Sequence, residues 1–156
     1  MGEIGQRVAQ LAAAFGCEVC YYSTSGKNSQ QSIPQVDLKT LLSECDVISI
    51  HAPLNAQTEN LIGAEELKQL KPGAIILNLG RGGIIDEQAM ATALDTQDLY
   101  HGTDVLAVEP MLVDHPYLSV KAAHRLVVTP HTAWASVEAR ACLIEKVAGN
   151  IQTFMN

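Results

Sequence analysis

Apolar residues along the chain form short continuous runs that alternate with helically spaced positions. The runs predict strands at 17–22, 46–50, 74–78, 100–106 and 126–129. The helical spacing predicts helices at 3–15, 37–44, 64–70, 86–94 and 136–154. Apolar strands alternating with helices are typical of an α/β fold with a doubly wound parallel sheet.

Polar and turn-forming residues mark the limits of these elements. Asp37 and Asp86 can each cap the helix that follows, and Gly16 ends the first helix. The polar, aperiodic stretch 23–34 predicts a loop with a minor strand at its end. Pro53 follows the strand at 46–50, where it ends the ladder. The chain therefore divides cleanly into elements without repeats.

Composition adds two constraints on this sheet. The 156 residues suffice for about one domain with its own core. Hydrophobic residues make up 47% of the chain and charged residues 17%, against about 25% charged in an average soluble domain. This balance favours either a sheet covered on both faces or a surface that a missing partner covers.

Charge and hydropathy limit the classes of partner that the protein is expected to bind. The net charge of −7 comes without any basic cluster, so we expect neither nucleic acid nor an anionic membrane as a partner. No apolar run approaches the roughly 18 residues that span a bilayer, and the N-terminus lacks a secretory pattern. These features predict a cytoplasmic protein.

Four cysteines are present, and two of them form a C-x-x-C pattern at Cys17 and Cys20. In a strand, residues three apart point to opposite faces, and no second pair completes a zinc site. We therefore expect free, buried thiols here and no metal site.

Three short segments each place a reactive side chain after an apolar run: Arg81, Glu109 and His131. Arginine offers a planar fork of donors that can hold a carboxylate and polarise a neighbouring carbonyl, and histidine can transfer a proton near neutral pH. Glu109 could orient that histidine. Because ligands bind beyond the carboxyl ends of parallel strands, this set suits the reduction of a 2-keto acid.

Other polar and aromatic residues have simpler explanations. Helix capping accounts for Asp86. The histidines at 101, 115 and 124 have no matching partners in the sequence, and we expect surface or packing roles for them. Trp134 is expected to pack or to form a pocket wall.

The N-terminus carries a glycine turn. Gly2-Glu3-Ile4-Gly5 precedes an amphipathic helix and then a strand, which matches the last four positions of G-x-G-x-x-G. Such a turn lets the backbone approach a pyrophosphate at a helix N-terminus. The acidic residue that meets the ribose about 20 residues later is replaced by Ser23, with Lys27 nearby. NAD and NADP therefore both remain open as the cofactor.

Together these motifs resemble the NAD-binding, Rossmann-type domain of the D-isomer-specific 2-hydroxyacid dehydrogenases, and within that family the glycerate dehydrogenase and hydroxypyruvate reductase group. The resemblance rests on the glycine turn and on the segments His51-Ala52-Pro53-Leu54, Lys71-Pro72-Gly73-Ala74, Asn78 to Gly83, Asp104 to Pro110 and Thr129 to Trp134. It covers nearly the whole chain, and the motifs occur in the family's order.

The resemblance implies a role for each matching position. Arg81 corresponds to the substrate-binding arginine, His131 to the acid/base and Glu109 to its paired acid. Asp104 corresponds to the aspartate beside the nicotinamide carboxamide. The positions that correspond to the pyrophosphate turn are Gly2, Glu3, Ile4 and Gly5, and those that border the cofactor are His51, Pro53, Thr58, Leu79 and Gly80. Ser23 departs from the common aspartate.

The resemblance also implies parts beyond these residues. We expect residues 1–156 to form a dinucleotide-binding domain that lacks its first strand and a separate substrate domain. Such a chain should be inactive and poorly stable alone, while the full-length form should be a homodimer acting on a small 2-keto or 2-hydroxy acid. The alternatives are a dinucleotide-sensing, corepressor-like binding module and a non-functional remnant.

Overall fold

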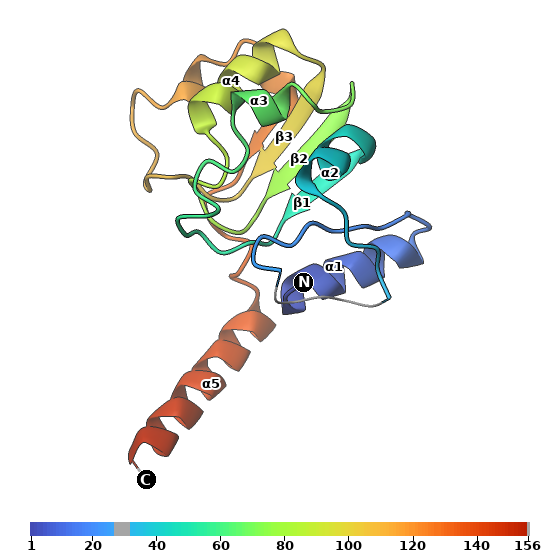
Figure 1. The fold of residues 1–156 in the computed structure, drawn as a ribbon. Helices are drawn as coiled ribbons and strands as arrows, with labels where there is room; N and C mark the ends of the chain where they lie inside the picture. Colours follow the sequence, from blue (N-terminus) through green and yellow to red (C-terminus); the bar gives the residue numbers. More distant parts are fainter. Residues whose placement is uncertain (27–31, 156) are drawn as a thin grey trace.

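The computed structural model describes residues 1–26 and 32–155, and a parallel four-stranded sheet in the order β1-β2-β3-β4 forms its centre (Figure 1). The strands are β1 Val47–Ile50, β2 Ala74–Asn78, β3 Leu99–Thr103 and β4 Leu126–Val128. The helices are α1 Glu3–Ala14, α2 Leu38–Glu44, α3 Ala64–Leu67, α4 Glu87–Thr96 and α5 Val137–Met155, and the 3-10 helices are η1 Pro116–Ser119 and η2 Ala123–Arg125. The predicted α/β fold with a parallel sheet is confirmed. Lys27 and part of the predicted loop lie outside the described residues.

Two helices start where their predicted capping residues stand, whereas one helix and one strand end earlier than predicted. Asp37 accepts a hydrogen bond from the Thr40 amide and Asp86 one from the Ala89 amide, so both predicted caps are confirmed. Helix α3 stops at Leu67, short of the predicted end. Strand β3 stops at Thr103, because the Thr103 hydroxyl bonds the carbonyl of Val105 at 2.7 Å and turns the chain out of the ladder.

One face of the sheet carries the core. Buried positions alternate with less buried ones along β1, β2 and β3, whose buried side packs against α2, α3 and α4, whereas β4 has no buried residue. On the other face Val47, Ile75 and Tyr100 are 55%, 36% and 40% exposed. Of the two possibilities that the composition left open, the described residues do not show a sheet covered on both faces, and one face of the sheet has exposed apolar side chains. Successive right-handed crossovers in one direction place their helices on the same face.

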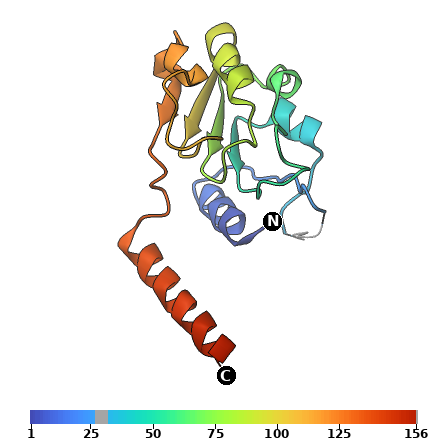
Figure 2. The same ribbon diagram turned by 90° about the vertical axis from the view of Figure 1, so that its left-hand side faces the viewer.

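The predicted strand at 17–22 does not join the sheet. Tyr21 forms a single parallel bridge with Gln35, and β1 is the edge strand on this side. Without a neighbouring strand the segment cannot build a ladder. Helix α1 forms as predicted but lies at the end of the sheet, near the loops after β1 (Figures 1 and 2). Only its Gly5 and Ala9 are buried, so most of its apolar positions do not pack on the sheet.

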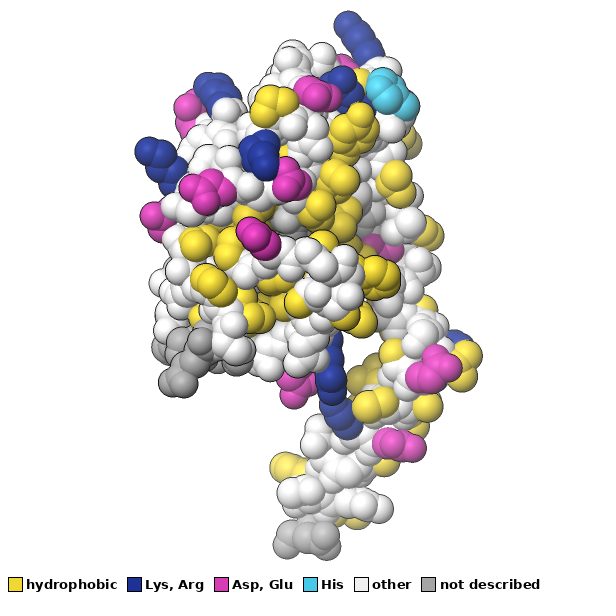
Figure 3. Space-filling view, turned by 90° about the vertical axis from the view of Figure 1, so that its right-hand side faces the viewer, with side chains coloured by type: hydrophobic (Ala, Val, Ile, Leu, Met, Phe, Trp, Pro, Cys, Tyr) yellow, Lys and Arg dark blue, Asp and Glu magenta, His cyan; other side chains and the backbone are white. Residues whose placement is uncertain are grey.

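Helix α5 forms where the sequence predicts it but extends away from the body of the molecule (Figures 2 and 3). It has no buried residue, and its hydrophobic side chains, such as Ile144 and Phe154, face solvent. Its apolar residues are thus available to other surfaces. Among the described residues, no helix combines the length and the apolar character that a membrane crossing requires.

The cysteines are free thiols, as expected. Cys20 and Cys45 are half-buried with their Sγ atoms 3.5 Å apart, and burial together with this contact raises the pKa of Cys45 to about 11. Cys17 is exposed, not buried as expected, because its segment has no strand beside it.

The two faces of β2 give a test of this one-sided core. Ile76 is fully buried and Ile75 is 36% exposed. We expect Ile76→Ala to lower the free energy of unfolding by about 2–5 kcal/mol and Ile75→Ala by less than half as much. Denaturant titrations of both variants measure this, and equal losses would contradict the assignment of the core to one face.

Candidate active site

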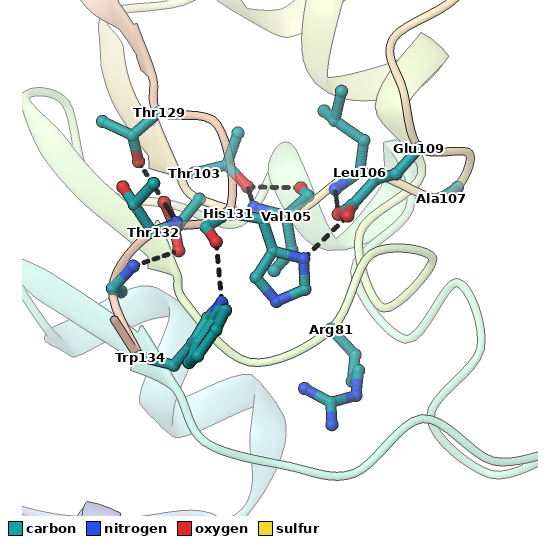
Figure 4. A network of polar contacts seen from close by, with 12 residues as sticks. Arg81, Thr103, Val105, Leu106, Ala107, Glu109, Thr129, His131, Thr132 and Trp134 are labelled. Atoms are coloured by element: carbon teal, nitrogen blue, oxygen red, sulfur yellow. Dashed lines mark hydrogen bonds and ion pairs between the residues drawn. The ribbon is translucent and has the colours of Figure 1, made fainter. Parts of the chain in front are cut away.

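The candidate residues follow the carboxyl ends of three neighbouring strands. Arg81 comes after β2, Glu109 after β3 and His131 after β4. The strands are parallel, so these ends lie at one edge of the sheet. Figure 4 shows the three side chains there together. The structure thus brings the predicted catalytic set into one site.

His131 and Glu109 form a hydrogen-bonded pair. His131 Nδ1 lies 2.7 Å from Glu109 Oε2, and both side chains are partly exposed, at 40% and 37%. The other carboxylate oxygen, Oε1, accepts a hydrogen bond from the Leu106 amide at 2.9 Å. The carboxylate of Glu109 is therefore fixed from two sides.

This pairing determines how the imidazole of His131 can act. A carboxylate only accepts hydrogen bonds, so the proton of the pair sits on His131 Nδ1. The second ring nitrogen, Nε2, then points toward the side on which Arg81 lies (Figure 4). The hydrogen bond from His131, followed by that from the Leu106 amide, holds the pKa of Glu109 below its ordinary 4.5. Glu109 is thus charged where it faces the imidazole.

Asp104 holds the segment that carries His131. One oxygen of its buried carboxylate accepts hydrogen bonds from the Thr129 hydroxyl and the Thr132 amide, and the other from the Ala133 amide at 2.8 Å. Burial opposes ionisation, but these hydrogen bonds hold the pKa of Asp104 below 3.8. His131 has a φ of 53°, uncommon for a residue other than glycine. The Asp104 contacts on both sides of it maintain this conformation.

The indole of Trp134 gives the turn a further contact. Its Nε1 donates to the carbonyl of His131 at 2.9 Å, and the side chain is 54% exposed. The ring stands beside the imidazole in Figure 4. Trp134 therefore lies beside His131, and its expected role as a pocket wall stays a prediction.

Arg81 belongs to a turn that Asn78 holds. The buried amide of Asn78 accepts from the Gly80 amide at 3.1 Å and donates to the Arg81 carbonyl at 2.9 Å. The guanidinium of Arg81 is exposed and donates one hydrogen bond to the Gly80 carbonyl. No role was expected for Asn78 from the sequence. A polar residue that closes a continuous apolar strand was the available signal.

The glycine turn lies against the end of β1. An added Cβ on Gly5 would lie 2.9 Å from Cγ of the flexible Met1 side chain and 3.7 Å from His51 Cβ, so Gly5 lies close to His51. Gly2 caps α1 without a side-chain hydrogen bond, and a Cβ there would meet nothing within 4 Å. Glu3 and Ile4 are exposed. The turn and the His51 segment are therefore adjacent, as a shared cofactor site requires.

The remaining predicted cofactor positions occupy different environments. Gly80 approaches β1, with its Cβ position 3.4 Å from the Ile50 carbonyl oxygen, and Leu79 is 48% exposed. Thr58 is fully buried, and its hydroxyl donates to the Pro53 carbonyl at 2.6 Å, inside the loop after β1. Their cofactor roles stay predictions.

Two further predicted positions can be placed by their contacts. The His51 ring contacts the Ser49 hydroxyl at 2.9 Å, and burial lowers the pKa of His51 below 6.5. Ser23 is half-buried, and its hydroxyl accepts a hydrogen bond from the Gly26 amide at 3.1 Å. Both can still turn a polar atom to a ligand, and their cofactor roles likewise stay predictions.

Comparison with known families agrees with this geometry. Residues 1–133 match the D-isomer specific 2-hydroxyacid dehydrogenase, NAD binding domain. The chain belongs to this family. The match contains the residues from the glycine turn to His131, and ends one residue before Trp134. The family resemblance expected from the sequence is confirmed.

Individual relatives support the same placement. The chain is 39% identical to glycerate dehydrogenase from Methylorubrum extorquens and 36% identical to hydroxypyruvate reductase from Blautia hydrogenotrophica, over 99% of its own length and 48% of theirs. An acyclic imino acid reductase solved with NADPH and D-Arg superposes with a TM-score of 0.89 at 35% identity, covering 99% of this chain and 48% of that one. D-lactate dehydrogenase from Aquifex aeolicus, solved with NAD and lactic acid, gives a TM-score of 0.88 at 26% identity, covering 99% and 51%. The chain thus spans about half the length of the relatives it matches.

The lowered pKa of Glu109 gives a test of the His131 pair. His131→Gln should raise the pKa of Glu109 toward 4.5, because the strongest donor to its carboxylate is lost. Because the folded pKa is depressed, the pair stabilises the site above pH 4.5 and is lost as pH falls through the folded pKa. Carbon-13 NMR of the Glu109 side-chain carboxyl measures its pKa in the parent chain and in His131→Gln. A Glu109 pKa that is the same with and without His131 would contradict the pairing.

Proposed function

We propose that this chain is the nucleotide-binding and catalytic half of an oxidoreductase that interconverts a small 2-keto acid and its 2-hydroxy acid. The observation that carries the proposal is the 2.7 Å contact of His131 Nδ1 with Glu109, which leaves Nε2 toward Arg81. Membership of the 2-hydroxyacid dehydrogenase family supports it. The substrate class that we propose resembles hydroxypyruvate or glycerate, in keeping with the names of two relatives.

Arg81 binds the substrate carboxylate in this proposal. Its guanidinium is exposed and donates one N–H to the Gly80 carbonyl, which leaves further donors of the planar fork for a bidentate contact. The same donors can polarise the neighbouring keto oxygen. Asn78 fixes the backbone of this turn through two hydrogen bonds, so the arginine starts from a defined position.

His131 supplies the proton. In the reduction, the protonated imidazole gives the hydrogen on Nε2 to the carbonyl oxygen of the substrate, which becomes the hydroxyl. Glu109 keeps the other proton on Nδ1 and stabilises the positive ring with its negative charge. In the reverse direction Nε2 takes the proton back. The pair therefore serves both directions without moving.

A nicotinamide dinucleotide, NAD or NADP, fits the residues beside this set. The close approach at Gly5 and the open space at Gly2 place free amides of the first turn of α1 near the His51 segment. When bound, the reduced nicotinamide supplies the hydride for the carbonyl carbon. Asp104 retains acceptor capacity on Oδ2, which receives one hydrogen bond from Ala133, and this suits contact with a carboxamide. Ser23 presents no carboxylate to repel a 2′-phosphate.

The proposed reaction also requires protein surfaces beyond this half. We propose that the substrate lies between these residues and a second domain, and that the full-length form is a homodimer. The exposed apolar side chains of α5 and of the open sheet face, such as Ile144 and Ile75, are what such contacts would cover. Size measurements on the full-length form test this, and a monomer would contradict the dimer.

A chimera tests the catalytic assignment. Residues 1–156 replace the matching half of the Methylorubrum extorquens glycerate dehydrogenase, and reduction of hydroxypyruvate, glyoxylate and pyruvate is followed with NADH and NADPH. We expect His131→Ala to lower kcat about 100-fold or more with little change in cofactor affinity. The matched control is His124→Ala, which removes an exposed histidine outside the site. Undiminished turnover in His131→Ala would refute the role.

Arg81→Lys is the second variant of this chimera. Lysine keeps the charge but loses the planar fork, so KM for the keto acid should rise and kcat should fall, each about tenfold or more. Arg140→Lys, an exposed change on α5, serves as its control. Equal kinetics in the two variants would exclude Arg81 from substrate binding.

The unfused chain should bind the dinucleotide but not reduce keto acids. Arg81 is exposed and His131 partly exposed here, and a water-filled site weakens every charge contact that the reaction uses. Titration of Trp134 fluorescence with NADH and NADPH measures binding and decides the preferred cofactor. Robust turnover by the unfused chain would contradict the need for a second domain.

A further inference from the structure

A second carboxylate–histidine pair lies behind the Glu109 loop. Glu87 Oε2 is 3.0 Å from His115 Nε2, and the two side chains are only 15% and 5% exposed. Glu87 is the first residue of α4, directly after the cap Asp86, and His115 precedes η1. The sequence suggested no more than a packing or surface role for His115. Burying a charged carboxylate costs free energy unless hydrogen bonds compensate for it, so the partners of Glu87 identify what its burial serves.

The hydrogen positions of this pair follow from its neighbours. His115 Nδ1 lies 3.2 Å from the Tyr117 amide, which can only donate, so Nδ1 is the acceptor. The ring proton is then on Nε2 and is donated to Glu87. The tilted ring of Tyr117, 4.9 Å away, closes the site from another side. The pair therefore has one defined tautomer in a closed setting.

The other oxygen of Glu87 reaches the loop that carries Glu109. Glu87 Oε1 accepts a hydrogen bond from the Ala107 amide at 2.7 Å. The preceding amide, that of Leu106, donates to Glu109 at 2.9 Å. Consecutive amides of one short loop therefore point at two carboxylates, one buried and one in the active site. A shift of the loop would change both contacts together.

Gly82 fixes the same loop from the opposite side. A Cβ on Gly82 would lie 2.0 Å from the carbonyl carbon and oxygen of Leu106 and 2.3 Å from the Ala107 nitrogen, so no side chain can fit there. Gly82 directly follows Arg81. The loop is thus held between α4 and the arginine turn, and its position sets the spacing of Arg81 and Glu109.

We propose that Glu87 and His115 act as positioning residues, which hold the 106–107 backbone so that Glu109 stays aligned with His131 Nδ1. The role deepens the proposed function, on which it rests, and neither residue touches the substrate or the cofactor. Helix capping does not explain Glu87, because Asp86 already caps α4. A carboxylate also binds an amide more strongly than a neutral acceptor would.

Glu87→Gln is the decisive variant because it keeps the shape of the side chain. A glutamine that accepts from the Ala107 amide must turn its NH2 group toward His115 Nε2–H, so two donors face each other. Relief requires the loop or the histidine to move. Asp86→Asn is the matched control, since it makes the same chemical change one residue away and asparagine still caps a helix.

The readouts are the tautomer of His131, by nitrogen-15 NMR of the unfused chain, and the kinetics of the chimera. We expect Glu87→Gln to reduce the fraction of His131 that carries its neutral-ring proton on Nδ1 and to lower kcat about tenfold, with KM for the keto acid and NADH changed less than threefold. Asp86→Asn should change neither. Should Glu87→Gln fail to fold by circular dichroism, His115→Asn serves instead, because asparagine can still accept from the Tyr117 amide.

Glu109→Gln separates this inference from the proposed function. If Glu109→Gln alters the His131 tautomer and kcat but Glu87→Gln and His115→Asn do not, the positioning role is wrong and the proposed function stands. If Glu109→Gln itself has no effect on either readout, the proposed function fails. A KM change as large as the kcat change in Glu87→Gln would also overturn the positioning role, because general damage to the site would then explain it.

Discussion

The site depends on the parallel alignment of β2, β3 and β4. Parallel strands end at the same edge, so turns that are far apart in sequence become neighbours there. The Asp104 amide donates to the Asn78 carbonyl at 3.0 Å, which continues the β2–β3 pairing into the site. Asp104 in turn binds the Thr132 and Ala133 amides, so the β4 turn is tied to the β3 turn. Each turn therefore takes its position from the strand beside it.

Hydrogen bonds of two carboxylates and one amide side chain, all largely buried, hold these turns. Asn78 holds the Arg81 turn, Asp104 holds the His131 turn and Glu87 holds the loop before Glu109. Each binds backbone atoms in strong, directional contacts that compensate for its burial. The reactive side chains themselves are partly exposed and have few contacts of their own. Rigidity is thus supplied from beneath the site, while the reacting groups remain accessible.

Local sequence signals predicted the parts of the structure that local interactions determine. Strands β1 and β2, the caps at Asp37 and Asp86, and the set of Arg81, Glu109 and His131 follow from apolar runs and the residues that end them. The predicted strand at 17–22 does not form, because a strand needs a neighbouring strand that the local pattern does not place, and the pattern likewise gives no position for α1 and α5 relative to the sheet. Asn78 was missed because its partners are backbone groups, and Glu87 because its partners, the Ala107 amide and the His115 ring, lie 20 and 28 residues away along the chain.

The central claim is that Arg81 and His131 face one substrate from two neighbouring turns. The most direct measurement is a crystal structure of the chimera with reduced dinucleotide and oxamate, a keto acid analogue that is not reduced. The account predicts a bidentate contact of the oxamate carboxylate with Arg81 and a hydrogen bond from His131 Nε2 to its carbonyl oxygen. Oxamate bound without Arg81, or an imidazole of His131 turned away from it with the Glu109 pair intact, would contradict it.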